Sequence, residues 1–498
     1  MALETQAPVA ERTSNTFYRV SERPGIRLIA LIALFVIAPL LLLRTPFVAD
    51  PDLGFHLRTG DWILQHGSVP RVESFSSYAM GKSWVAYSWL FEVILSLLFR
   101  WGQLVGVILY GVVMRLLIGV ALWRMVSRVL PQFWAAWAVT VPAVVVISLI
   151  NGPRPVLFSV LFVVLVVDAL VAGQGTGWGN IWWLPAIFAV WANVHIQFVH
   201  GIVIIGAFAL EATWRRIRQG DFGAKPLRLW SLMTACMAAT LVNPYGVGVW
   251  KLVWTFLHQP KLYNLIIEMQ APDFREATEY IVLIMVIASG FALGRQRRLR
   301  PAWALLLIFA AEQGFRSRRE LWFTAVIAAA IIANVAGEHL PRMERARMFP
   351  VRGYAAVALC TVALLGAGAR FFNLNNDFLW MQMHGRFPEV AVRYIERNHL
   401  HGGIFNVYGW GGYLMWRLPE MPVAIDGRAN NVHDQDHVQR VFDTWRAKPG
   451  WQNDPELNAA DIVIGRADYP LTSLLRYDQR FRVAHEDREA VVFVKAQR

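Results

Sequence analysis

The sequence predicts a mainly α-helical protein: a polytopic transmembrane helical bundle followed by a small extracytoplasmic C-terminal α/β domain. Of 498 residues, 56% are hydrophobic, and the mean hydropathy is +0.39. Long apolar runs are separated by short polar connections, which is typical of multispan membrane proteins. From residue 371 onwards, charge increases and short strand-like runs alternate with helical ones. We therefore expect a cytoplasmic tail over 1–26, a membrane domain over 27–370 and an α/β domain over 371–498.

About 11 helices are expected to cross the bilayer, allowing for tilt and burial of short segments. The first has no small-residue cleavage site after it and is expected to remain as a signal anchor. Residues 89–100 would rise only about 18 Å as a helix against a hydrocarbon core of about 30 Å, so we expect a juxtamembrane or half-inserted helix there. The expected spans are 28–48, 104–123, 133–150, 155–172, 181–197, 199–214, 228–243, 279–294, 301–314, 320–335 and 352–369.

The net charge of +13 comes largely from short basic clusters between apolar segments. Such clusters act as topology signals, so a nucleic-acid partner is not expected. Placing the N-terminus inside and not counting 89–100 as a span puts four clusters in the cytoplasm. The large first loop, 49–103, and everything after residue 370 then face outwards. The four clusters are Arg124/Arg128, Arg215/Arg216/Arg218/Lys225/Arg228, Arg295/Arg297/Arg298/Arg300 and Arg342/Arg345/Arg347/Arg352.

One basic group, Arg316, Arg318 and Arg319, falls on the outer side against this rule. Two interpretations remain open. Either a span is misplaced there, or the arginines stay outside for a reason such as binding a lipid phosphate.

The first outer loop opens with two acids, Asp50 and Asp52, in an Asp-Pro-Asp run just beyond the first span. An amphipathic stretch over 53–66 follows, in which His56 lies one helical turn after Asp52. Asp and Pro are common at helix N-termini, so the acids can serve as a cap. Their position favours the other interpretation, a site that takes a proton or holds a divalent cation.

Further polar residues fall on the same side of the bilayer. Arg154 lies in NGPRPVLF, His195 and His200 lie in WANVHIQFVHG, and Glu268 lies in IIEMQAPDF. Polar groups at membrane depth are costly and usually face a cavity. Each has an ordinary alternative, such as a tight turn or a histidine with a structural partner. As a group they indicate a site on the outer side.

In the C-terminal domain we expect strands near 403–408, 422–426, 461–465, 481–485 and 489–495. Helices are expected near Gly411, over 435–446 and over 470–477. Asp426-Gly427-Arg428 follows a predicted strand, and ligands dock at that end of strands in open α/β sheets. Asp-Gly is also common turn chemistry, and both interpretations remain open.

This organisation resembles the GT-C class of membrane glycosyltransferases. GKSWVAYSWLFEVILSLLFRWG is similar to the segment after the acidic motif of protein mannosyltransferases and lipid A aminoarabinose transferases, with Asp-Pro-Asp in place of the mannosyltransferase Asp-Glu pair. NGPRPVLFSVLFVVLVVDAL resembles their later outer loop and span. VYGWGGYLMWRLPEMPVAIDGRANN resembles, in spacing, a module of oligosaccharyltransferase catalytic subunits. Trp410 replaces that module's acceptor-reading Asp, so recognition of a peptide sequon is not expected.

The resemblance implies transfer of a sugar from a polyprenyl-phosphate carrier to a lipid, glycan or protein acceptor at the outer face of a bacterial cytoplasmic (inner) membrane. Asp50 or Asp52 would be the general base. The lipid phosphate would be stabilised by Arg154 and the arginines at 316, 318 and 319. A divalent metal held by Asp50, Asp52 and His56 remains open. The other expected substrate-binding residues are His56, Arg58, His195, His200, Glu268, Trp410, Tyr413, Asp426 and Arg428.

Two other function classes remain open. A transporter or flippase of a lipid-linked or polar solute would use intramembrane charges and a cavity that reaches across the bilayer. The sequence carries no inverted repeat and no matched pair of broken segments, which favours a catalyst. A non-catalytic assembly partner would use the outer loop as scaffold. A catalyst should instead show a closed acidic pocket at the outer face beside a lipid-width groove.

Overall fold

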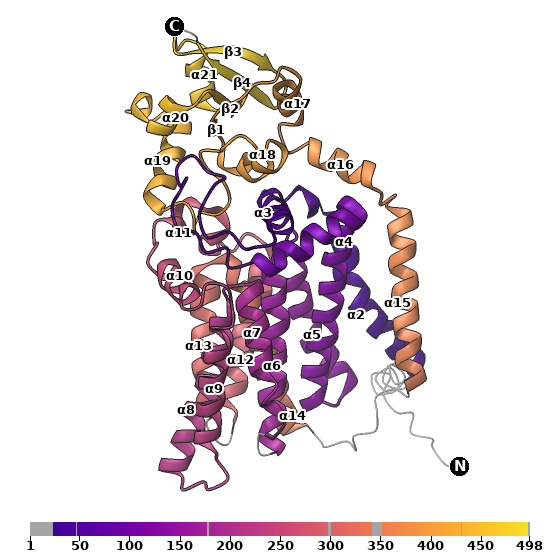
Figure 1. The fold of residues 1–498 in the computed structure, drawn as a ribbon. Coiled ribbons are helices and arrows are strands. Elements are labelled where there is room, and N and C mark those ends of the chain that lie inside the picture. The colour runs from indigo at the N-terminus through magenta and orange to yellow at the C-terminus, as the bar shows by residue number, and fades with distance from the viewer. Residues whose placement is uncertain are drawn as a thin grey trace, which may run out of the picture.

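The computed structural model describes residues 23–45, 47–176, 179–296, 300–340, 351–429 and 431–496. The helices form an elongated bundle, and the α/β domain sits on one end of it (Figure 1). Within the described ranges, seven helices are long and apolar enough to cross a membrane. The predicted fold class, a polytopic helical bundle with a small C-terminal α/β domain, is confirmed. Most of the expected N-terminal tail, residues 1–22, lies outside the described residues.

A helix occupies each of the expected spans. Four of them, α5, α7, α9 and α13, have fewer than the 18 residues of the long spans. The bundle helices are α2 (Pro24–Arg44), α4 (Trp89–Val129), α5 (Phe133–Ser148), α6 (Val156–Thr176), α7 (Leu184–Val194), α8 (Phe198–Arg218), α9 (Pro226–Ala239), α12 (Ala277–Gly294), α13 (Pro301–Arg316), α14 (Leu321–His339) and α15 (Val351–Phe371).

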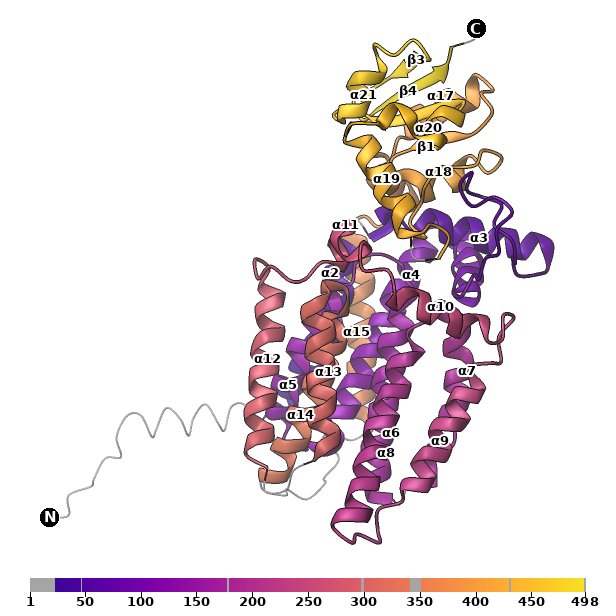
Figure 2. The same ribbon diagram turned by 90° about the vertical axis from the view of Figure 1, so that its left-hand side faces the viewer.

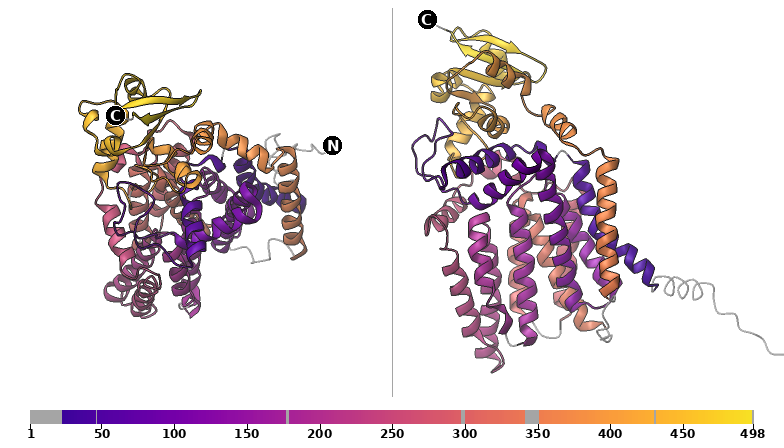
Figure 3. Two further views of the ribbon diagram at one scale, coloured as in Figure 1. Left: turned by 45° about the horizontal axis from the view of Figure 1, so that its top comes forward. Right: turned by 45° about the vertical axis from the view of Figure 1, so that its right-hand side comes forward.

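Burial differs strongly between these helices. The segment Arg318–His339, which includes α14, is 78% buried, and α14 packs against α5, α12 and α13. Its alanine-rich sequence allows close approach of neighbouring backbones. By contrast, α15 is only 11% buried and runs along the outside of the bundle beside α2 (Figure 3). Its apolar side chains are therefore left for lipid.

Helix α4 is bent where the sequence analysis separated a short helix from a span. Gln103 has a non-helical backbone (φ 51°, ψ −135°), which breaks α4 into 89–102 and 104–129. The two parts fold back on each other so closely that a Cβ at Gly106 would overlap the carbonyl oxygen of Leu98. Glycine is needed at this contact because it has no side chain.

The described basic ends of α4 and α8 lie at the end of the bundle opposite the α/β domain (Figures 1 and 2). This arrangement agrees with the expectation that the basic connections and the C-terminal domain lie on opposite sides of the membrane. Which end faces the cytoplasm stays a prediction. Five members of the predicted clusters lie outside the described residues: Arg297, Arg298, Arg342, Arg345 and Arg347.

The α/β domain contains one sheet of order β1-β2-β4-β3, in which β1 and β2 are parallel and the other neighbours are antiparallel. Its strands are β1 (Ile404–Asn406), β2 (Ile462–Arg466), β3 (Phe481–Glu486) and β4 (Ala490–Lys495). Its helices are α16 (Asn376–His384), α17 (Glu389–Arg397), α18 (Gly411–Arg417), α19 (Gln435–Trp445), α20 (Pro455–Ala459) and α21 (Pro470–Leu475). Short 3-10 turns include η4 (Arg318–Glu320) and η5 (Tyr408–Trp410).

The strand expected at 422–426 is not formed as a regular element. Val423 instead makes single parallel bridges to Ile404 on one side and Ser76 on the other. Pro422 cannot donate a ladder hydrogen bond, and the Asp-Gly turn follows three residues after Val423, so the segment is too short for a strand. The loop between α2 and α4 thus extends the edge of the C-terminal sheet through Ser76.

Helix α3 (Leu53–His66) lies between the bundle and the α/β domain (Figure 1). It crosses α18 at two glycines, and a Cβ on Gly54 would overlap the carbonyl oxygen of Gly412. A Cβ on Gly412 would in turn lie 2.6 Å from the carbonyl oxygen of Pro51. The backbone before α3, which carries the two acids, is thus held directly against the α/β domain.

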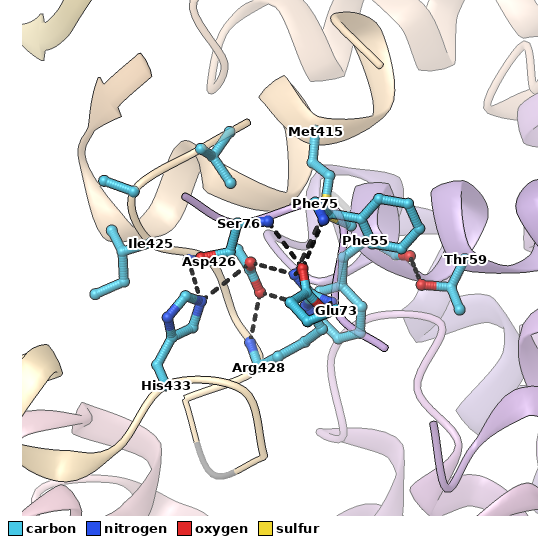
Figure 4. A network of polar contacts seen from close by, with 12 residues as sticks. Phe55, Thr59, Glu73, Phe75, Ser76, Met415, Ile425, Asp426, Arg428 and His433 are labelled. Atoms are coloured by element: carbon cyan, nitrogen blue, oxygen red, sulfur yellow. Dashed lines mark hydrogen bonds and ion pairs between the residues drawn. The ribbon is translucent and has the colours of Figure 1, made fainter. Parts of the chain in front are cut away.

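A buried ion network joins the loop to the same domain (Figure 4). The guanidinium of Arg428 donates to Asp426 (2.8 and 2.7 Å) and to Glu73 (2.7 and 3.2 Å). Glu73 Oε1 also accepts from the backbone N–H groups of Phe75 (2.7 Å) and Ser76 (2.8 Å). These charged side chains are at most 4% exposed, so each carboxylate depends on its partners in place of water.

Candidate active site

Arg154 lies in the connection between α5 and α6 and gathers three carboxylates. Its Nε donates to Asp50 Oδ2 at 3.0 Å, and its Nη2 donates to Glu268 Oε1 at 2.9 Å. Asp52 Oδ2 lies farther away, 3.5 Å from Nη2. The pKa of Arg154 is raised well above its ordinary value, because the three carboxylates outweigh the opposing effect of burial. The structure therefore brings together four of the residues expected from sequence.

Asp50 is held in place by its neighbours on two sides. Its Oδ1 accepts the backbone N–H of Asp52 at 2.8 Å, and its Oδ2 accepts from Arg154. Gly152 packs against the same carboxylate and has a φ of +89°, in the region that favours glycine. A Cβ at Gly152 would overlap Asp50 Oδ2. With both oxygens engaged, Asp50 is suited to orienting Arg154 and the backbone of Asp52.

Replacing Gly152 with alanine is expected to displace Asp50 and to separate it from Arg154. Strain at positive φ and the overlap with the carboxylate act in the same direction, each costing on the order of 1 kcal/mol or more. We expect a lower midpoint of thermal unfolding in detergent for this variant. Gly67→Ala is the matched control: Gly67 also has a positive φ (63°), but no atom lies within 4 Å of its would-be Cβ. Equal effects of both substitutions would contradict the role given to the Asp50 contact.

Asp52 is the least committed of the three carboxylates. It occupies the N-cap position of α3, yet its side chain makes no capping hydrogen bond to that helix. The capping interpretation therefore does not describe what this side chain does. Removal from water raises its pKa to about 7, with Arg154 opposing and Asp50 reinforcing the shift. A carboxyl group with this pKa can exchange a proton near neutral pH.

The arginines at 316, 318 and 319 differ in their partners. Arg318 is paired with Asp273 (2.6 Å) and Glu279 (3.1 Å), and Arg316 pairs with Glu312 (3.5 Å) one turn earlier on α13. Arg319 forms no hydrogen bond or ion pair with any residue in the described ranges. It lines two of the cavities that meet Arg154. Arg319 is therefore a cation available to an anionic ligand.

Three cavities converge on Arg154. The polar cavity (about 60 Å³) holds room for a few water molecules and lies between the first loop, Arg154 and Arg319. The bundle cavity (about 270 Å³) shares Arg319 with the polar cavity. Its walls are mainly apolar and include Val146, Leu149, Ile150, Ile267, Leu321 and Trp322. The interdomain cavity (about 590 Å³) lies under the α/β domain and shares Asp52 with the polar cavity. Asp52 thus lies where the polar and interdomain cavities meet, and Arg319 lies where the polar and bundle cavities meet.

The residues proposed for a metal do not form a common ligand set. His56 lines the polar cavity, but its Nδ1 contacts Glu92 Oε1 at 3.2 Å. Asp50 and Asp52 face Arg154. Within the described ranges, no group of three or more His, Cys, Asp or Glu side chains is arranged to hold a metal ion. We derive no step through a metal.

Two expected histidines are buried in the bundle next to cavity-lining residues but do not themselves line the three cavities. His195 follows α7, and its Nδ1 is 2.7 Å from Ser159 Oγ. His200 is on α8, and its Nε2 is 3.6 Å from Glu320 Oε2, next in sequence to Arg319. Both side chains therefore contact polar groups of other elements.

The expected residues of the C-terminal domain are divided between its core and the polar cavity. Trp410 donates to the carbonyl oxygen of Arg386 at 3.1 Å, and Tyr413 donates to Glu389, both inside the domain. Arg428 lines the polar cavity from within the ion network of Asp426. One further expected substrate-binding residue, Arg58, is on α3 and not in this domain. Its guanidinium donates to the carbonyl oxygen of Pro419 at 3.1 Å.

The cavity walls include residues that the sequence does not single out, among them two tyrosines and an asparagine. Tyr87 and Asn431 line the polar cavity, and Tyr408 lines the interdomain cavity. Burial is the main cause that raises the pKa of Tyr87, to about 12, so its phenol stays protonated at neutral pH. An isolated tyrosine in a loop gives no sequence signal of its own. Its role follows only from the position of Arg154, which comes from another element.

The structure is similar to those of several solved protein chains. No family model matches the chain, and no curated protein matches its sequence. The structure is similar to the crystal structure of ArnT from Cupriavidus metallidurans bound to undecaprenyl phosphate, with a TM-score of 0.47 and 17% sequence identity over 93% of this chain and 98% of that one.

Proposed function

We propose that this protein is a membrane glycosyltransferase that transfers a sugar from a polyprenyl-phosphate carrier to an acceptor hydroxyl at the outer face of the cytoplasmic membrane. The observation that carries the proposal is the meeting of three cavities at Arg154, with a proton-accepting carboxyl group and an unpaired guanidinium on its two sides. Such a site can bind two substrates that approach from different directions.

Asp52 is proposed as the general base. When ionised it takes the proton of the acceptor hydroxyl as the acceptor oxygen bonds to the anomeric carbon. Its pKa of about 7 lets a sizeable fraction be ionised at neutral pH. Arg154 and Asp50 are proposed to orient it: Asp50 accepts the Asp52 backbone N–H, and Arg154 lies 3.5 Å from its carboxylate. From the sequence alone, Asp50 and Asp52 are equal candidates for the base.

Arg319 and Arg154 are proposed to stabilise the departing phosphate. The bond between the anomeric carbon and the phosphate oxygen breaks, and its electron pair leaves with the carrier. Arginine suits phosphate because its planar fork offers two parallel N–H donors. The apolar walls of the bundle cavity, which Arg319 lines, suit the first part of the carrier's hydrocarbon chain. Arg154 already interacts with three carboxylates. We therefore assign the larger part of the phosphate stabilisation to Arg319, which has no ion-pair partner among the described residues.

Direct release of carrier tests the proposal. Purified protein in lipid nanodiscs would be incubated with radiolabelled polyprenyl-phosphate sugars and a mixture of lipid, glycan and peptide acceptors that carry free hydroxyl groups, with and without a chelator. Free polyprenyl phosphate would then be quantified. We expect release from at least one donor. Uptake of an intact lipid-linked sugar into vesicles, without release of carrier, would favour the transporter or flippase instead.

Replacing Arg319 with alanine is expected to weaken binding of polyprenyl phosphate by about 10- to 100-fold, since a hydrogen bond to a charged group contributes about 1.5–3 kcal/mol. The measurement is a titration of short-chain polyprenyl phosphate into nanodisc-embedded protein. Arg275→Ala is the control. Arg275 lies at the same end of the bundle as Arg319, but its side chain is 84% exposed and pairs only loosely with Asp273, at 3.7 Å. Equal affinities of the two variants would remove Arg319 as the phosphate ligand.

A further inference from the structure

The interdomain cavity differs in its walls from the other two. Its α/β-domain side carries four aromatic rings: Tyr408, Phe442, Trp445 and Tyr469. Tyr408 and Phe442 meet edge to face at 5.3 Å between ring centroids, and Trp445 and Tyr469 do so at 5.9 Å. The rings are thus held as two fixed pairs. At about 590 Å³ the cavity has the size of a small-molecule site.

Unused hydrogen-bonding groups accompany these rings. The hydroxyls of Tyr408 and Tyr469 make no hydrogen bond with any described residue, and the same is true of the Asn264 side-chain amide on the opposite wall. Burial, and secondly the charge of Asp52, raise the pKa of Tyr408, so its phenol remains a donor at neutral pH. Polar groups at a wall without a protein partner are available to a ligand.

The charges of the cavity favour a neutral ligand. Asp52 and Glu268 reach it from the bundle side, and both face Arg154. Arg446, at the exposed rim, has its guanidinium 6.0 Å from the centre of the Phe442 ring. Among the described residues, Arg446 is thus the cavity-lining charge without an ion-pair partner, and it lies at the exposed rim, while the charges farther inside pair with one another. Aromatic faces combined with neutral donors and acceptors suit a pyranose ring, which has apolar C–H faces and hydroxyl edges.

We propose that the interdomain cavity binds a neutral carbohydrate, which presents a hydroxyl group to Asp52 and is the acceptor of the reaction. This inference rests on the proposed function and specifies its acceptor class. An extended peptide is disfavoured because the edge of β1, the strand that leads into Tyr408, is already paired with Val423. Tyr408 and Tyr469 would hydrogen-bond the sugar, and the aromatic pairs would contact its ring faces.

Saturation-transfer NMR on the full-length protein in nanodiscs tests the inference. The probes are α- and β-linked di- and trisaccharides of glucose, galactose, mannose and N-acetylglucosamine, with N-acetylated tripeptides as the rival class. We expect at least one saccharide to bind and its Kd to rise at least fivefold in the Tyr408→Phe/Tyr469→Phe double variant. Tyr477→Phe is the matched control, since Tyr477 is 88% exposed on the same domain and does not line the cavity.

Three results would overturn the inference: no saccharide binds, the tripeptides bind in their place, or the double variant binds saccharide as well as the control does. The removed hydroxyls lie in the interdomain cavity, so the double variant is expected to retain its affinity for polyprenyl phosphate. Failure of carrier release with intact saccharide binding would count against the proposed reaction and leave the carbohydrate site standing. Carrier release without saccharide binding would count against the carbohydrate acceptor alone.

Discussion

Replacing Asp52 with asparagine is expected to lower the transfer rate by about 10²- to 10⁴-fold, the usual contribution of a positioned general base. Asparagine keeps the size of the side chain but cannot take up the proton. Initial rates of carrier release at saturating donor would measure the loss. Asp61→Asn is the matched control, because Asp61 is on the same helix, α3, and pairs with Arg100 at 2.9 Å, outside the three cavities. Near-normal turnover of Asp52→Asn would remove Asp52 as the base.

The pH dependence gives an independent readout of the same residue. Removal from water raises the pKa of Asp52 to about 7, and a general base works only when ionised. The kcat/KM of the unaltered protein is therefore expected to fall as pH drops through about 7. In Asp52→Asn, the residual activity should lose this acidic limb. An unchanged limb would assign the titration to another group.

Replacing Arg428 with leucine is expected to destabilise the protein by about 3–5 kcal/mol, because removal of one partner leaves buried charges uncompensated. Asp426 and Glu73, with side-chain exposures of 0% and 1%, would lose the guanidinium that lies between them. A lower midpoint of thermal unfolding in detergent would measure the effect. Because Glu73 belongs to the first loop, we also expect faster proteolysis of residues 67–88.

The control for this substitution is Arg476→Leu in the same domain. Arg476 pairs with Glu486 at 2.7 Å, but the two side chains are 34% and 44% exposed. Water can replace such a partner, so little change in the midpoint is expected. An equal shift for both variants would show that the burial of the Arg428 network does not matter for stability.

The bundle could be predicted from the sequence because each span is a local pattern. A long apolar run is a helix in lipid whatever its neighbours are, since no other structure satisfies the backbone there. The bend at Gln103 was likewise anticipated, because 89–100 was too short to cross alone. The strand at 422–426 was predicted wrongly. Its apolar run was read correctly, but its only cross-strand partners, Ile404 and Ser76, limit it to single bridges.

The site could be predicted only in part, because its contacts join distant positions. Sequence patterns pointed to Asp52 and Arg154 individually. They could not show that Arg154 is paired with Glu268, 114 residues away, while Arg319 has no ion-pair partner among the residues that the structure describes. Nor could they show that Arg428 binds a loop carboxylate 355 residues earlier. The ion pairs that an arginine makes decide whether it is available to a ligand. These ion pairs exist only in the folded chain.

The attachment of Gly54 to Gly412 and of Ser76 to Val423 has a consequence for biogenesis. The first loop is synthesised before most spans, whereas its partners emerge from the ribosome after α15, the last helix of the bundle. A fully inserted chain would therefore pass through a stage in which the α/β domain does not yet cover the acids before α3. Such long-range pairing is slow to form, so maturation of the reaction centre would be the final event of assembly.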